Sequence, residues 1–208
     1  MGKGVSIYLV DDDAVVRHAM LSQLASSGYS ARAFASAEAF LASVDLTRAG
    51  VLLLDQQMGG MSGLGLQEEL RNHNAVMPVI FITGHADIPM SVSAMRSGAM
   101  TVLEKPLSTR QLIECLEEAI AVAKEQDDAR RLRLIIGRRF EVLTPREQEI
   151  MEAIVAGQSN RVLAERFGIA VRTVESHRYS IMRKMQANTL PELVLMASVG
   201  ELFHPGNE

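Results

Sequence analysis

The sequence predicts an α/β domain followed by an all-α domain: a five-stranded, doubly wound parallel sheet, then a helical linker, then four helices. Three observations predict this. Short apolar runs alternate with helical patterns over residues 1–123. Only helical periodicity remains over residues 140–208. The stretch between them, 124–139, is charged, contains no Pro and is too apolar for a disordered tether.

The first domain contains five apolar segments that are typical of buried strands. They lie at 5–10, 31–34, 51–54, 79–83 and 102–103. Helical patterns follow the strands. The first ends at Gly28, and the next three cover 37–42, 63–72 and 88–97. A long helix comes last, and Ser108 and Gln111 form a capping box at its start. Strands this apolar, each followed by a helix, indicate a parallel sheet that is covered on both faces.

Polar residues follow these strands at the point where each strand ends. They are Asp11 and Asp12, Asp55, Thr83 and Lys105. Parallel strands present their carboxyl ends at one edge of a sheet, where such folds bind ligands. Clustered carboxylates need a cation, and hard oxygen donors suit Mg²⁺. A carboxylate beside Mg²⁺ can accept a phosphoryl group, whose charge a Lys and a hydroxyl stabilise. Each residue alone could be an ordinary cap or surface group, but the full set favours a site.

The segments carrying these residues resemble the signature of CheY-like receiver domains over about residues 4–123, and residues 83–90 are similar to the FixJ branch. The matching segments are Leu9-Val10-Asp11-Asp12, Leu53-Leu54-Asp55, Ile82-Thr83-Gly84-His85 and Glu104-Lys105-Pro106. The resemblance implies that a sensor histidine kinase phosphorylates Asp55. It further implies that Asp12, Asp55 and the backbone carbonyl of Gln57 hold Mg²⁺, with Asp11 supporting them. Thr83 is then the switch hydroxyl, and Lys105 pairs with the phosphoryl group.

Three positions depart from the receiver pattern. Gly59 and Gly60 follow Met58, where the family usually has Pro, so a constraint on the loop is lost. Val102 stands where a Tyr or Phe usually reports phosphorylation, and Leu107 replaces a common Phe. The chemistry therefore looks intact, whereas phosphorylation-independent or weakly switched behaviour stays open.

The two halves of the chain carry opposite charge. Residues 1–123 contain eight Lys and Arg against thirteen Asp and Glu, a net charge of −5. Residues 130–190 contain twelve against six, a net charge of +6. The basic half is the candidate for binding a polyanion. The Arg-rich linker is expected to be helical and could contribute to a dimer seam, although its apolar spacing does not sustain heptads.

The second domain contains a complete helix start and an amphipathic helix. Thr144, Pro145 and Glu147 form the N-terminal signature of one helix. A second helix is expected to be capped by Asn160. In a third, over 171–185, one stripe is apolar while the other side is polar and bears Arg, as a major-groove recognition helix requires. An ordinary solvated helix fits the charge pattern equally well. His177 lies on the apolar stripe without a second ligand nearby, which favours a partly buried imidazole over a metal ligand.

The motifs of this domain are similar to the LuxR-type domain of NarL/FixJ regulators over about residues 140–203. They are 143–147, 160–164, 172–178 and 181–185. The resemblance implies a helix-turn-helix whose 171–185 helix enters the major groove of double-stranded DNA. One departure is Ala170, where a Ser or Thr cap is common, and a short helix over 191–198 is the expected dimerisation element. The resemblance implies that Arg161 and Lys184 contact the DNA backbone. The full set of implied DNA contacts is Arg161, Arg172, Thr173, Glu175, Ser176, Arg178, Tyr179, Arg183 and Lys184.

The sequence as a whole predicts a two-component response regulator: a cytoplasmic transcription regulator rather than a turnover enzyme, with no membrane segment, that dimerises on activation. Two alternatives remain. Residues 11–15 fit the Asp-x-Asp-x-Val pattern of haloacid-dehalogenase-type phosphatases. The receiver could also serve only as a dimerisation scaffold. The single Cys115 is expected to be a buried, inert thiol on the apolar side of a helix.

Overall fold

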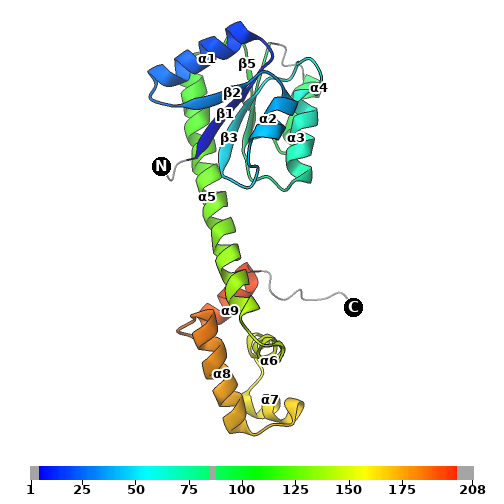
Figure 1. Ribbon diagram of the computed structural model, residues 1–208, viewed down its shortest axis with the longest axis vertical. Coiled ribbons are helices and arrows are strands. Elements are labelled where there is room, and N and C mark those ends of the chain that lie inside the picture. Colours follow the sequence, from blue (N-terminus) through cyan, green and yellow to red (C-terminus); the bar gives the residue numbers. More distant parts are fainter. Residues whose placement is uncertain (1–4, 85–87, 201–208) are drawn as a thin grey trace. The chain divides into compact units, whose positions relative to one another are not determined.

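The computed structural model describes residues 5–84 and 88–200, which fall into two compact units, Met1–Asp127 and Asp128–Glu208. Within these residues, no helix is long and apolar enough to cross a membrane. The first unit is an α/β domain (Figure 1). Its strands are β1 Ser6–Val10, β2 Ala31–Phe34, β3 Gly50–Leu54, β4 Val79–Thr83 and β5 Thr101–Glu104. The helices that connect them are α1 Ala14–Ser26, α2 Ala37–Ser43, α3 Gly63–Asn72 and α4 Ile88–Arg96.

The sheet is parallel throughout, with the strand order β2-β1-β3-β4-β5. This confirms the expected doubly wound sheet. Val10 lies opposite Leu54 in the neighbouring strand, and Thr83 lies opposite Glu104. Because these pairs are the last residues of their strands, the polar residues that follow them meet at the same edge of the sheet.

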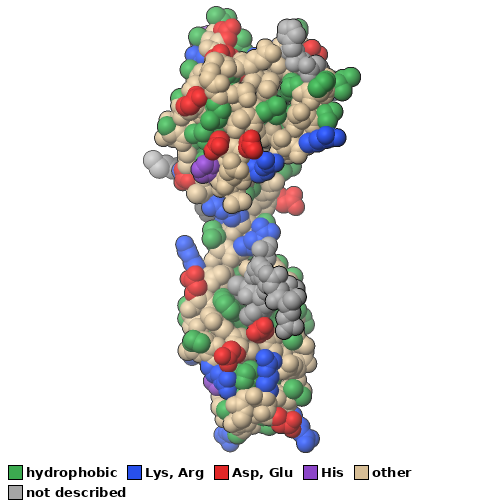
Figure 2. All heavy atoms as spheres, turned by 90° about the vertical axis from the view of Figure 1, so that its right-hand side faces the viewer, with side chains coloured by type: hydrophobic (Ala, Val, Ile, Leu, Met, Phe, Trp, Pro, Cys, Tyr) green, Lys and Arg blue, Asp and Glu red, His purple; other side chains and the backbone are tan. Residues whose placement is uncertain are grey.

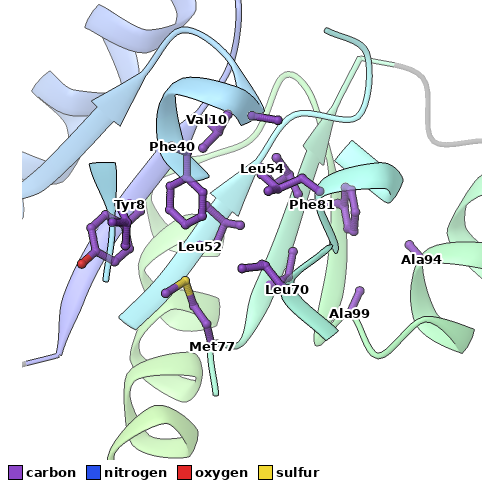
Figure 3. Packing of buried hydrophobic residues seen from close by; sticks show 14 residues of the cluster. Tyr8, Val10, Phe40, Leu52, Leu54, Leu70, Met77, Phe81, Ala94 and Ala99 are labelled. Carbon is purple, nitrogen blue, oxygen red and sulfur yellow. The ribbon is translucent and has the colours of Figure 1, made fainter. Parts of the chain in front are cut away.

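Alternate residues of the strands build two apolar layers, one on each face of the sheet. Tyr8, Leu52 and Phe81 point toward α2, α3 and α4, as Figure 3 shows for this cluster. The intervening residues, such as Leu9 and Leu53, pack against α1 and the helix that follows β5. This strict alternation explains why every residue of β3 and β4 is buried.

The helix that follows β5, α5 Thr109–Glu141, belongs to both units. The Ser108 hydroxyl accepts from Gln111 N–H (3.2 Å), and the Gln111 side chain accepts from Ser108 N–H (3.1 Å), so the expected capping box is present. The first part of α5 buries Leu112 and Leu116 against the sheet. Its last part buries Ile136 in the core of the second unit. The linker is therefore helical, as expected, and both cores contain side chains from this helix.

The second unit is all-α, and after the end of α5 it contains α6 Pro145–Val155, α7 Asn160–Phe167, α8 Val171–Met185 and α9 Leu190–Val199. The capping box of Thr144 and Glu147 at the start of α6 is confirmed. The expected cap of α7 is wrong by one residue: the Ser159 hydroxyl accepts from Val162 N–H, and Asn160 is the first helical residue. Both residue types cap well, and the one with an extended backbone takes the position.

Candidate functional site

The polar residues at the carboxyl edge of the sheet form a hydrogen-bonded cluster. The Nζ atom of Lys105, which follows β5, donates to Asp11 Oδ2 and to Asp55 Oδ1, each at 2.8 Å. Asp11 follows β1 and Asp55 follows β3, so one ammonium joins carboxylates from two neighbouring strands. The strand register explains the approach, because all three residues lie just beyond the last residue of a strand.

The environment of the cluster shifts the pKa values of Asp55 and Lys105. Asp11 and Asp55 are both buried, with 2% and 6% of their surface exposed. The pKa of the Asp55 carboxyl is raised, because burial and the nearby Asp11 carboxylate together outweigh the lowering effect of Lys105 and the Gln57 N–H. Burial acts to lower the pKa of Lys105, but the hydrogen bonds to Asp11 and Asp55 outweigh burial and raise it. The positive charge of Lys105 is thus firmly held.

Backbone N–H groups bind the other carboxylate oxygens. Gln57 N–H donates to Asp55 Oδ2 at 2.8 Å, and Gly59 N–H donates to Asp12 Oδ2 at 2.9 Å. Asp11 Oδ1 accepts from Asp13 N–H at 2.9 Å. The loop between β3 and α3 is therefore attached directly to Asp12 and Asp55.

Thr83, the last residue of β4, is 1% exposed, and its carbonyl accepts from Lys105 N–H at 2.8 Å. The structure therefore places Thr83 on the strand next to the one that Lys105 follows. Val102, in β5, is half-buried and packs against the core. Sequence reasoning missed Gly63, the first residue of α3, where a Cβ atom would lie 2.5 Å from the Asp55 carbonyl oxygen and 2.8 Å from the Phe81 ring. Only such close packing, which the sequence does not reveal, makes this glycine necessary.

The donor set at this edge suits a hard divalent cation. Three carboxylates and one ammonium leave two negative charges, and Asp12 is exposed to solvent. In the described part of the chain, no three His, Cys, Asp or Glu side chains are gathered so that they could hold a metal alone. Mg²⁺ typically uses only one or two carboxylates and completes its coordination with water or phosphate oxygens. The residues present fit that mode of binding.

Asp13 has a structural role that weakens the phosphatase alternative. Its side chain caps α1, accepting from Val15 N–H at 2.7 Å and from Val16 N–H at 3.4 Å. Asp13 is the second Asp of the Asp-x-Asp-x-Val pattern. In this structure its carboxylate is engaged in capping α1.

The expected recognition helix, α8, has the predicted amphipathic character. Val174, Ile181 and Met185 are buried in the core of the second unit, and no side chain caps the helix at Ala170. His177 is half-buried, as expected. The residues of α8 that are exposed are Val171, Arg172, Thr173, Glu175, Ser176, Tyr179 and Arg183, and Arg178 is half-buried.

Lys184 differs from the other expected DNA contacts, because its ammonium binds a buried carboxylate. Its Nζ atom donates to Glu147 Oε2 at 2.5 Å, and the Ser180 hydroxyl donates to Glu147 Oε1 at 2.6 Å. Glu147, in α6, is only 4% exposed. Burial alone would raise its pKa, but hydrogen bonds from Lys184, Ser180 and Thr144 lower it to about 2. Lys184 therefore joins α8 to α6.

Other basic residues of the second unit also have local partners. Arg161 is exposed on α7 and lies 3.6 Å from Glu165. Arg139, in α5, donates to the Met185 carbonyl at 3.1 Å, at the C-terminal end of α8. Both signs of charge are visible on the surface in the view of Figure 2. On α8 itself, Arg172 and Arg183 are exposed, together with Glu175.

Cys115 is half-buried in α5 and packs against the core of the first unit. Burial raises the pKa of its thiol, and the carboxylates of Glu118 and Glu114 add to the effect. The thiol is less buried than expected, but a raised pKa keeps it protonated and poorly nucleophilic, as the sequence predicts.

The comparisons with known proteins agree with both halves of this description. Residues 7–117 match the family described as response regulator receiver domain, and residues 141–197 match bacterial regulatory proteins of the luxR family. The chain is 40% identical over 199 residues to the transcriptional regulatory protein FixJ of Rhizobium meliloti, covering 94% of this chain and 96% of that protein. It is also 40% identical over 189 residues to the tetrathionate response regulatory protein TtrR of Salmonella typhimurium, covering 91% and 90%.

Solved structures of response regulators are similar as well. The response regulator StyR matches with a TM-score of 0.82 at 36% identity, covering 94% of this chain and 98% of that one. Full-length FixJ from B. japonicum matches with a TM-score of 0.56 at 35% identity, covering 98% and 100%. This chain belongs to the response regulators that join a receiver domain to a LuxR-type helix-turn-helix domain, and it regulates transcription by binding DNA.

Proposed function

We propose that Asp55 is the phosphoacceptor of this regulator and that its phosphorylation, by a sensor histidine kinase, controls the DNA-binding domain. A carboxylate oxygen of Asp55 forms the new bond to phosphorus as the bond from phosphorus to the kinase histidine breaks. The product is an acyl phosphate. The observation that carries the proposal is the position of Lys105 Nζ, 2.8 Å from both Asp55 and Asp11, in a buried cluster at the carboxyl edge of the sheet.

Each remaining residue of the cluster has a role in this proposal. Lys105 stabilises the charge of the transferred phosphoryl oxygens, and the Thr83 hydroxyl binds one of them after transfer. Asp12, Asp55 and the Gln57 carbonyl hold Mg²⁺, with Asp11 supporting them through Lys105. When bound, the metal supplies positive charge that lets the phosphoryl group approach a carboxylate. Receiver domains of this kind generally bind Mg²⁺ at the phosphorylation site.

A labelling experiment tests the acceptor assignment. The full chain is incubated with Mg²⁺ and acetyl phosphate, and the acyl phosphate is located by reductive trapping and peptide mass spectrometry. Wild type should be labelled at Asp55, and Asp55→Asn should not be labelled. Asp13→Asn is the matched control, because it removes a neighbouring carboxylate while Asn preserves the cap of α1. Equal labelling of Asp55→Asn and wild type would contradict the assignment.

The DNA contacts form the second part of the proposal. The exposed side of α8 enters the major groove, where Glu175, Ser176 and Tyr179 read bases and nearby phosphates. Arg172, Arg178 and Arg183 contact phosphates or bases, Thr173 adds a polar contact and Arg161, in α7, contacts the backbone. Lys184 acts indirectly, because its ammonium is bound to Glu147. On activation the chain forms a homodimer that binds paired half-sites.

Salt dependence tests these contacts one residue at a time. If an Arg binds a phosphate, its replacement by Ala weakens binding to all sequences and reduces the slope of log K against log salt by about one. If it reads a base, the loss is confined to the preferred operator. Arg71→Ala, an exposed Arg of the first unit, is the control. Unchanged affinity in the Arg172, Arg178 and Arg183 variants would exclude α8 as the DNA-reading helix.

A further inference from the structure

A third carboxylate, Glu38, holds the loop that carries the proposed phosphorylation site. In the loop between β3 and α3, three alternate N–H groups each donate to a different carboxylate. Gln57 N–H binds Asp55 at 2.8 Å, Gly59 N–H binds Asp12 at 2.9 Å and Met61 N–H binds Glu38 at 3.0 Å. The first two carboxylates belong to the site, but Glu38 lies in the first turn of α2 and no role has been assigned to it.

The backbone of this loop is unusually free at the point that Glu38 holds. Gly59 and Gly60 are adjacent, and Gly60 has a φ of +92°, a conformation that costs other residues strain. A Cβ atom on Gly60 would come within 3.0 Å of Glu38 Oε1, so the carboxylate packs directly against the glycine. Two consecutive glycines give the loop backbone many accessible conformations. The hydrogen bond from Met61 limits this freedom directly beyond the glycines, ahead of the bonds from Gly63 N–H and Leu64 N–H to Gln56.

The protonation of Glu38 agrees with this attachment. Backbone hydrogen bonds, from its own N–H and from Met61, lower the pKa of the Glu38 carboxyl. At neutral pH the side chain is thus a carboxylate, and it accepts a charge-assisted hydrogen bond from the loop.

We propose that Glu38 is a positioning residue for phosphoryl transfer: by binding Met61 N–H, it holds the two-glycine loop so that Asp12 and the Gln57 carbonyl can bind a divalent cation. The proposal rests on the proposed function of Asp55. Glu38 does not touch the reacting atoms. Its contribution is to reduce the number of loop conformations, and hence to raise the affinity for the cation.

The decisive comparison is between Glu38→Ala and Glu38→Gln. Both variants lose the negative charge near the N-terminus of α2, so they lose the same favourable interaction with the helix dipole. Only Gln keeps an oxygen that can accept from Met61. Glu68→Gln is the control, because Glu68 is an exposed carboxylate on α3 whose partner is Arg71.

Mg²⁺ is titrated into the unphosphorylated full chain while the amide signals of Gly59 and Met61 are followed by NMR. We expect Glu38→Ala to raise the half-saturating Mg²⁺ concentration about fivefold, the effect of losing one typical hydrogen bond. Glu38→Gln should raise it less than twofold. With acetyl phosphate as the donor, saturating Mg²⁺ should restore the labelling rate of Glu38→Ala. A purely structural role would lower the melting temperature without changing this Mg²⁺ dependence.

Two results would overturn the proposal: Mg²⁺ affinity in Glu38→Ala that equals the wild-type value, or an equal loss in Glu38→Ala and Glu38→Gln, which would point to charge instead of the hydrogen bond. A failure of the proposed function is distinguishable from these. It would show as unlabelled wild type or labelled Asp55→Asn, whereas the NMR titration needs no phosphodonor.

Discussion

Replacing Lys184 with Met removes one partner of the buried ion pair that joins α8 to α6. Breaking a buried pair typically costs about 3–5 kcal/mol, because one charge stays buried without compensation. Here Glu147 would keep the Ser180 hydroxyl and the Thr144 N–H as donors, at 2.6 and 2.8 Å. We therefore expect a smaller loss of about 2–3 kcal/mol in the stability of the second unit.

The lowered pKa of Glu147 makes the stability of the second unit depend on pH. Lowering a carboxyl pKa from 4.5 to about 2 corresponds to about 3–4 kcal/mol, at about 1.4 kcal/mol for each pH unit, and Lys184, Ser180 and Thr144 contribute to it together. Because the pKa in the folded state is below that in the unfolded state, this stability is fully present above about pH 5. It is lost as the pH falls toward 2. In Glu147→Gln this part of the pH dependence should be missing.

Native-state hydrogen exchange with mass spectrometry measures the effect in the full chain. Protection of the α6 and α8 peptides in Lys184→Met should fall by about 30- to 150-fold, equivalent to about 2–3 kcal/mol. Arg183→Met is the matched control, because Arg183 is the exposed neighbour on the same helix. Equal losses in the two variants would refute the reasoning. A double variant, Glu147→Leu with Lys184→Met, should recover only part of the stability. Apolar replacement of a whole pair is often neutral, but the Ser180 hydroxyl and the Thr144 N–H would lose their acceptor.

Three further substitutions test the packing. Gly63→Ala places a Cβ 2.5 Å from the Asp55 carbonyl oxygen, so thermal denaturation should show a loss of about 1–3 kcal/mol; a wild-type midpoint would contradict the close approach. Ala170→Ser supplies the missing cap of α8 and should add about 1 kcal/mol, seen as slower exchange of its first amides. Gln67 is 3% exposed, and its Oε1 atom has no hydrogen-bond partner among the residues that the structure describes. Gln67→Leu should therefore stabilise the first unit by about 1 kcal/mol in urea denaturation, and a loss would show that the amide is needed.

Much of the fold follows from sequence because local patterns determine it. The strands of the first unit are continuous apolar runs, and parallel pairing places their last residues at one edge whatever the details of packing. For this reason the sequence could predict that Asp11, Asp55 and Lys105 meet. The beginning of α6 was predictable in the same way, since its capping box involves residues only three positions apart.

Contacts between distant residues account for what could not be predicted. Glu147 belongs to a local capping box and also binds Lys184, 37 positions away. No periodicity distinguishes such a lysine from one that only faces DNA. The contact of Lys184 with the DNA backbone, which the LuxR-type resemblance implies, stays a prediction. Glu38 is 23 positions from Met61 and reads as an ordinary residue of a first helical turn.

The most direct test of the account is DNA retention on a selected operator at fixed salt, with Mg²⁺ and with or without acetyl phosphate. Salt must be held constant, because phosphate contacts make affinity strongly dependent on it. The account predicts that the phosphodonor tightens binding by wild type and by Asp13→Asn but leaves Asp55→Asn unchanged. If all three proteins bind equally with and without the donor, the receiver is an uncoupled scaffold. Gly59 and Val102 would then mark where the coupling was lost.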